Sequence, residues 1–161
     1  MHQQHLLIYY SHFGDRANVN IIDHNGSSRL VDVADASMNI ATTYDGKSAS
    51  TPQGMYFGTD STAFDKDDYN IGLNGGSIIL EDQFEYLRAF GIQMVSDAAG
   101  DTAFVEFAQL THNFSGSNIT IQEVGFKGTI SAYAFLWARF LTGGVTLNSG
   151  NYLLSKFKVT V

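Results

Sequence analysis

The end of the chain alternates between apolar and polar positions. In residues 153–161, one parity is mostly apolar and the other mostly polar. The first set is Leu153, Ser155, Phe157, Val159 and Val161, and the second is Leu154, Lys156, Lys158 and Thr160. A period of two predicts a strand with one packed face and one largely hydrated face. Because β-branched residues favour paired strands, we expect this segment to lie inside a sheet.

Shorter apolar runs predict further strands along the chain. They cover residues 6–10, 21–23, 29–34, 38–43, 55–58, 102–110, 119–126 and 145–147. Residues 84–95 permit two interpretations, because Phe84, Leu87 and Arg88 also fall at helical spacing, which would suit a helix over 81–90. We favour a strand, since the alternation lasts longer and Gly91 would weaken a helix.

Two segments depart from simple alternation. The apolar parity changes between Ile121 and Val124, which predicts a β-bulge near Gln122 and Glu123. Residues 133–140 are apolar on both parities, so we expect a second sheet or another subunit to cover both faces of that strand. After it, a turn is predicted around Gly143 and Gly144 within residues 142–149.

Many short strands separated by Gly, Asn, Asp and Ser predict an all-β fold. We expect one domain over residues 1–161, an antiparallel β-sandwich of the jelly-roll kind. Residues 1–55 either complete this sandwich or form an arm. Residues 59–77 are the least regular part and are expected to form a long exposed loop.

Composition excludes several classes of function. The chain has no cysteine, so neither a disulfide framework nor a thiolate metal site is possible. Its net charge of −7 argues against nucleic acid as a partner. The amino terminus lacks the features of a signal peptide, and no apolar stretch approaches the ~20 residues of a membrane helix. We therefore expect no membrane partner.

The charge is also unevenly distributed. Residues 1–101 carry 14 acids and 5 bases, whereas residues 102–161 carry 2 acids and 4 bases. Asp-rich loops followed by uncharged strands are the simpler interpretation. Charge-complementary contact between copies is the other.

No segment matches a catalytic or metal-binding motif. A nucleophile elbow, a P-loop and a dinucleotide-binding glycine motif are absent. The acidic run 65–68 fails the EF-hand test, because the twelfth position from Asp65 is Gly76, where a bidentate Glu is needed. We expect a solvated turn there, surface or flexible histidines, and no metal or cofactor. The histidines are His2, His5, His12, His24 and His112.

Carboxylates and aromatic residues leave two weaker possibilities. A glycosidase needs two carboxylates about 5 to 9.5 Å apart in a cleft, and sequence alone cannot pair the candidates. These are Glu81, Asp82, Glu85, Glu106 and Glu123. Tyr44, Tyr56, Tyr69, Tyr133 and Trp137 could stack on sugars, but their apolar surroundings favour core packing. Residues 113–115 and 118–120 match the N-glycosylation pattern, which matters only in a eukaryotic secretory setting.

Several segments together resemble small structural proteins of tailed viruses of bacteria and archaea. The resembling segments, in chain order, are 58–62 (GTDST), 67–71 (DDYNI), 119–126 (ITIQEVGF), 136–139 (LWAR), 145–150 (VTLNSG) and 157–161 (FKVTV). The order and rough spacing are kept over about residues 56–161. Asp60 stands where the family has a glycine, Phe140 replaces an acidic residue, and residues 1–55 show no resemblance.

The resemblance implies a non-enzymatic, β-rich virion component without a catalytic set. It would belong to the capsid decoration, to a vertex or collar, or to the tail. It would be made in the host cytoplasm. The implied partners are further copies of the chain and other virion proteins, such as the major capsid protein or a neck or tail protein. The alternative is a virion-borne module that binds carbohydrate or a host receptor.

Candidate assembly residues come from the loop 59–77 and the segment 133–140. They are Phe64, Asp67, Asp68, Tyr69, Tyr133, Phe135, Trp137 and Arg139. An apolar strand covered on both sides suits symmetric self-association. We also expect Glu123 and Arg139 to form a structural pair across neighbouring strands.

Overall fold

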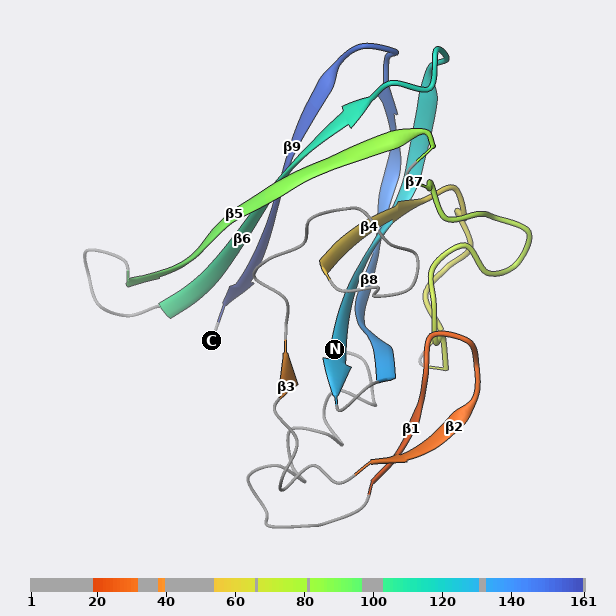
Figure 1. The fold of residues 1–161 in the computed structure, drawn as a ribbon, viewed down its shortest axis with the longest axis vertical. Coiled ribbons are helices and arrows are strands. Elements are labelled where there is room, and N and C mark those ends of the chain that lie inside the picture. The colour runs from red at the N-terminus through yellow and green to blue at the C-terminus, as the bar shows by residue number, and fades with distance from the viewer. Residues whose placement is uncertain are drawn as a thin grey trace. The chain divides into compact units, whose positions relative to one another are not determined.

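The computed structural model describes residues 19–31, 38–39, 54–65, 67–80, 82–96, 103–130 and 133–160. Within these residues it has nine strands and no helix, so the fold is all-β as expected (Figure 1). The strands are β1 (Val19–Ile22), β2 (Ser28–Val31), β3 (Met38–Asn39), β4 (Gly54–Gly58), β5 (Phe84–Ser96), β6 (Ala103–Asn113), β7 (Ile119–Ile130), β8 (Tyr133–Leu147) and β9 (Tyr152–Thr160). The strand predicted at 6–10 lies outside the described residues.

The strands form three sheets. β1 and β2 are an antiparallel pair. β3, β7 and β4 form a second sheet, in which β8 also pairs with β7. β5, β6 and β9 form a third sheet with antiparallel pairing throughout. None of the described segments is a helix that could cross a membrane.

The residue contacts group the chain into two compact units. Unit 1 comprises residues 1–41, 49–79 and 120–146, and unit 2 comprises 42–48, 80–119 and 147–161. Unit 1 therefore holds the first two sheets, apart from the ends of β7 and β8, and unit 2 holds the third. The arrangement of the sheets as one sandwich stays a prediction.

β5 settles the choice between helix and strand. Residues 84–96 form a strand that pairs with β6, with register shifts between Leu87 and Ala89 and between Phe90 and Gln93. The first shift falls at Arg88, the residue that interrupts the apolar parity in the sequence. The strand prediction is confirmed, and the interruption corresponds to an irregularity in the ladder.

β7 shows no irregularity in its register with β4. That register runs without a shift from Glu123 to Lys127 and does not include Gln122, so the bulge near Gln122 and Glu123 stays a prediction. Ile121, Glu123 and Gly125 are all buried, whereas Gln122 and Val124 are half-buried. The buried parity is therefore the same from 121 to 125, and hydrophobicity hides it because Glu123 is a carboxylate.

β8 confirms one expectation and corrects another. Ala134, Phe135 and Leu136 are buried at successive positions, so both faces of the strand are covered there. The turn predicted around Gly143 is wrong, because the strand continues to Leu147. Gly143 and Gly144 have φ of 74° and 88°, which lets the strand deform locally without breaking.

β9 follows the alternation predicted from sequence as far as its side chains are described. Leu153 and Ser155 are half-buried, whereas Tyr152, Leu154 and Lys156 are exposed.

The buried side-chain amide of Asn113 links segments of the chain that are apart in sequence. Asn113 donates from Nδ2 to the carbonyls of Ser117 and Leu147, and its Oδ1 accepts from Ser115.

Candidate functional site

The loop 59–77 is closed at its base and folds back onto unit 1. Thr59 donates its N–H to the Ser77 carbonyl at 3.0 Å, and Ser77 N–H donates to Thr59 Oγ1 at 3.0 Å. Asp60, Asp68 and Ile71 within the loop are buried. The prediction of an exposed protrusion is therefore wrong for these three residues, although residues 61–65 are exposed.

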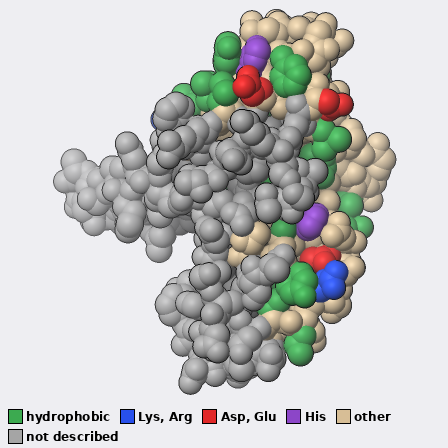
Figure 2. All heavy atoms as spheres, viewed as in Figure 1, with side chains coloured by type: hydrophobic (Ala, Val, Ile, Leu, Met, Phe, Trp, Pro, Cys, Tyr) green, Lys and Arg blue, Asp and Glu red, His purple; other side chains and the backbone are tan. Residues whose placement is uncertain are grey.

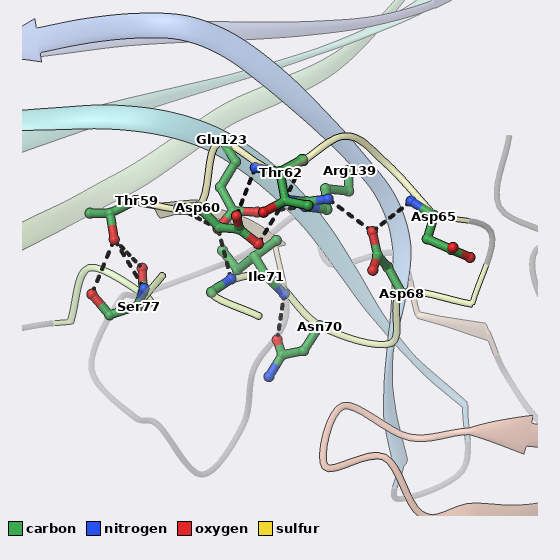
Figure 3. A network of polar contacts seen from close by, with 11 residues as sticks. Thr59, Asp60, Thr62, Asp65, Asp68, Asn70, Ile71, Ser77, Glu123 and Arg139 are labelled. Carbon is green, nitrogen blue, oxygen red and sulfur yellow. Dashed lines mark hydrogen bonds and ion pairs between the residues drawn. The ribbon is translucent and has the colours of Figure 1, made fainter. Parts of the chain in front are cut away.

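Arg139 on β8 is the centre of the site, and its side chain is 1% exposed. Its Nε donates to Glu123 Oε2 at 2.6 Å, and its Nη1 donates to Asp68 Oδ2 at 2.8 Å (Figure 3). Its Nη2 donates to the Thr62 carbonyl at 3.1 Å and forms an ion pair with Asp60 Oδ2 at 3.1 Å. The pair of Glu123 and Arg139 expected from sequence is thus present, as part of a larger network.

Glu123 on β7 uses both carboxylate oxygens. While Oε2 accepts from Arg139, Oε1 accepts the backbone N–H of Gly72 at 2.7 Å and of Asp60 at 3.3 Å. Asp60 lies near the start of the loop 59–77, and Gly72 lies in its second half. The Glu123 side chain is 0% exposed, so one buried carboxylate ties two distant parts of the loop to the sheet.

Burial and charge act in opposite directions on the pKa values of this network. Burial pulls the pKa of Arg139 down, but hydrogen bonding to Glu123 and the charges of Glu123, Asp68 and Asp60 outweigh it and raise the pKa. Burial raises the pKa of Asp60, yet its hydrogen bonds with Thr62 and the charge of Arg139 lower it overall. Both groups are therefore ionised at neutral pH.

Two glycines allow the close approach on which the network depends. A Cβ at Gly58 would overlap the Glu123 carboxylate, and a Cβ at Gly125 would overlap the side chain of Ile71. Gly58 ends β4 and lies opposite Glu123 in the register. The backbone needs glycine at these positions because the neighbouring side chain occupies the space of a Cβ.

Lys127, four residues along β7 from Glu123, is also buried. Its Nζ lies over the Tyr56 ring, 4.9 Å from the centroid. Burial lowers the pKa of Lys127 to about 8, against the raising effect of Glu123. Burial and the charge of Lys127 likewise lower the pKa of His24.

The chemistry of the Arg139 site is that of a structural lock. Its carboxylates are engaged by a permanently charged guanidinium and by backbone N–H groups, and charge-assisted hydrogen bonds of this kind are strong. Within the described residues, no group of three or more acidic or histidine side chains could hold a metal ion.

The structure separates the candidate assembly residues into two groups. Phe64 is 44% exposed and Asp67 is exposed, so both remain surface candidates. Asp68, Phe135 and Arg139 are buried, and this corrects their assignment as surface contacts. The side chain of Trp137 lies outside the described residues.

The tyrosines considered for sugar stacking have structural neighbours. The ring of Tyr69 lies against Gly26, where an added Cβ would come within 3.1 Å of it. Arg29 lies over the Tyr133 ring at 5.0 Å, and Tyr56 is buried beside Lys127. The core-packing interpretation holds for Tyr56, and Tyr44 lies outside the described residues.

The glycosidase candidates do not form a described pair. Glu123 is committed to Arg139, Asp82 is exposed, and Glu85 lies 3.5 Å from His112. Glu81 and the side chain of Glu106 lie outside the described residues, as do His2, His5 and His12. Of the two glycosylation patterns, Asn113 is fully buried with its amide engaged, whereas Asn118 is exposed.

The sequence did not predict that residues of the loop 59–77 contribute to the Arg139 network. Asp60 and Asp68 lie in a polar, turn-rich segment, which predicts solvated acids. The only available signal was the resemblance itself, because residues 58–62, 67–71, 119–126 and 136–139 all contribute to the network. Comparison of the chain with protein-family models, with curated proteins and with solved structures finds no match.

Proposed function

We propose that this chain is a non-enzymatic structural protein of a phage-like virion, present in several copies as a decoration, vertex, collar or tail component. The observation that supports this most is the convergence of four resembling segments on Arg139. These contacts give the four segments a common architectural task. Asp60, which stands where the family has a glycine, adds a further partner of Arg139 in this chain.

The state of the carboxylates supports the absence of catalysis in this proposal. Asp60, Asp68 and Glu123 are each buried and paired with the same guanidinium. A general acid or base needs a pKa near the working pH and access to substrate. Here the side chains of Asp60, Asp68 and Glu123 are 3%, 7% and 0% exposed, so a substrate in solution has little access to their carboxylates.

The lock also gives the protein a defined outer loop. Because residues 59 and 77 are joined and Glu123 binds both Asp60 and Gly72, the exposed residues 61–65 start from a fixed base. Phe64 and Asp67 are presented on this loop and remain our candidates for contacts with the capsid or a neighbouring virion protein. A fixed loop loses less entropy on binding than a disordered one.

The test is the copy number of the protein in virus particles. Particles are purified on a density gradient from cells that carry the gene, and the protein is quantified by mass spectrometry against labelled peptides. We expect a fixed ratio of several copies per particle relative to the major capsid protein. Absence from particles, together with saturable glycan binding by the isolated protein, would instead favour the carbohydrate or host-receptor module.

A further inference from the structure

The chain contains two Asn-Gly pairs, and both lie in exposed turns. Asn25 with Gly26 lies in the turn between β1 and β2, and Asn74 with Gly75 lies near the end of the loop 59–77. In such a pair, the residue after the asparagine has no side chain to shield its backbone nitrogen. The asparagine side chain is therefore open to attack by the backbone of the next residue, and the local structure decides whether this attack can occur.

The two turns place the glycine nitrogen differently. In the first turn, Gly26 is the last residue, and its N–H donates to the Asp23 carbonyl at 2.9 Å. In the second turn, the closing bond runs from the Gly76 N–H to the Leu73 carbonyl at 3.1 Å. Gly75 is thus a central residue of its turn, and its N–H takes no part in the closing hydrogen bond. None of the described residues accepts this N–H.

Backbone angles explain the form of the second turn. Asn74 has φ of 56° and Gly75 has φ of 91°. Positive φ at both central residues is the requirement of a type I′ turn. Asparagine is one of the few residues besides glycine that adopt positive φ readily, so the Asn-Gly pair is the sequence that this turn favours. The turn therefore selects the same pair that exposes the asparagine to attack.

The second turn is also the more open of the two. A Cβ added at Gly75 would meet nothing within 4 Å, whereas a Cβ added at Gly26 would come within 3.1 Å of the Tyr69 ring. Figure 2 shows mostly backbone and uncharged polar side chains on the side of the molecule where Figure 1 draws the loop 59–77. Because Asn74 and Gly75 are exposed, water has access to both residues.

We propose that Asn74 is a site of spontaneous deamidation that weakens the attachment of the loop 59–77 to the sheet. The Gly75 nitrogen loses its proton to hydroxide and attacks the side-chain carbonyl carbon of Asn74. A carbon–nitrogen bond forms, the bond to the side-chain nitrogen breaks, and that nitrogen takes up a proton and leaves as ammonia. Water then opens the cyclic imide at either carbonyl, which gives aspartate or isoaspartate. The net reaction consumes water and releases ammonia in equal amounts.

Deamidation at this position affects the Arg139 network through Asp60. A side-chain hydrogen bond with Asn74 contributes to stabilising the charged Asp60 carboxylate. The backbone of the turn is close as well, because a Cβ added at Gly76 would overlap the Cβ and the backbone nitrogen of Asp60. Asp60 in turn forms an ion pair with Arg139 at 3.1 Å. The turn therefore packs directly against one acid of the network.

Both products weaken this contact. A carboxylate at position 74 has no N–H to donate to Asp60, and it places a second negative charge beside that acid. Isoaspartate also lengthens the backbone by a methylene group, next to a position where Gly76 leaves no room for a Cβ. The reaction needs only water, so its extent increases with the age of the protein. This inference goes beyond the proposed function and does not depend on it.

Peptide mass spectrometry of the aged full chain tests the site. The purified protein is incubated in mildly alkaline buffer, and conversion of both asparagines is followed in the same sample. We expect position 74 to convert roughly tenfold faster than position 25, because the hydrogen bond of the Gly26 N–H must first break. In urea the two positions should convert at similar rates, since both are Asn-Gly pairs. Equal rates in the folded protein, or faster conversion at position 25, would overturn the site.

Two matched variants test the coupling to the Arg139 network. Asn74→Asp and Asn25→Asp each add a negative charge at an exposed turn. Asn74→Asp should accelerate hydrogen exchange of the Asp60 amide severalfold, whereas Asn25→Asp should leave it unchanged. Equal exchange of that amide in both variants would overturn the coupling, as would a deamidated protein that unfolds at the same urea concentration as the fresh one. Absence of the protein from virus particles would overturn the proposed function alone.

Discussion

The two compact units bury polar groups in opposite ways. Unit 1 buries ionised side chains, with Arg139 among three carboxylates and Lys127 nearby. Unit 2 buries the neutral amide of Asn113, whose donors and acceptor are satisfied by backbone carbonyls and by Ser115. Charged residues of unit 2 such as Glu85 and Lys156 are exposed instead.

This difference has consequences for how each unit responds to change. A buried amide needs no counter-charge and does not titrate, so its contacts persist over a wide pH range. A buried ionic network holds together only while every member is present, because a lone buried charge is costly. Unit 1 should therefore be sensitive to single charge removals and to pH, whereas unit 2 should not.

The largest effect should come from Arg139→Met. The substitution leaves Asp60, Asp68 and Glu123 buried without their shared cation. Removing one partner of a buried ion pair costs about 3–5 kcal/mol, and we expect a loss of that order in the free energy of unfolding measured with urea. Asp67→Asn, at an exposed acid of the same loop, is the matched control and should change it by less than about 0.5 kcal/mol. Equal stability of both variants would contradict the lock.

Lys127 should make stability depend on pH in the alkaline range. Burial lowers the pKa of Lys127 to about 8, whereas the unfolded chain has the ordinary value of 10.5. Between these values the unfolded state binds more protons, so stability rises with pH from about 8 to 10.5, by up to roughly 3 kcal/mol. Below pH 8 Lys127 is protonated in both the folded and the unfolded state, so the folded state bears the full cost of burying the charge.

The matched variant is Lys127→Met, which keeps the length of the side chain without its charge. Other groups titrate in the same range, so the quantity to measure is the difference in urea unfolding free energy between the two proteins. That difference should favour Lys127→Met at pH 7 and shrink towards pH 10.5. A difference that does not vary with pH would show that the ammonium is not desolvated.

A smaller effect is expected for Glu123→Gln. The amide oxygen can replace only one of the two acceptor oxygens, so either Arg139 Nε or the N–H groups of Gly72 and Asp60 face an amide donor. Leaving a buried donor unsatisfied costs about 1–3 kcal/mol, and chemical unfolding should show a loss of this size. Unchanged stability would mean that the carboxylate is not a structural partner of Arg139.

The sequence predicts the strands well where alternation reports burial. β5 and β9 form where alternation predicts them, and β4 forms where a short buried strand is expected. The apparent phase change near Gln122 arises because hydrophobicity is taken as the sign of the inward face. Glu123 is inward but charged, and periodicity cannot identify a buried carboxylate whose counter-ion lies on another strand.

The candidate site was only partly predictable for the same reason. The pair of Glu123 and Arg139 is predictable because the two are opposite charges on strands expected to be neighbours. The loop acids Asp60 and Asp68 gave no such signal, since acids in turns are mostly solvated. Their burial depends on tertiary contacts with Arg139, which comes more than 70 residues later for both of them.

The central claim is that Arg139 locks unit 1 while unit 2 is held by other contacts. Hydrogen exchange of the backbone amides in the Arg139→Met variant and the original protein tests it most directly. We expect the amides of Asp60 and Gly72, which donate to Glu123, to lose protection strongly, while those of the β5–β6–β9 sheet keep theirs. Unchanged protection at Asp60 and Gly72, or an equal loss in both units, would contradict the claim.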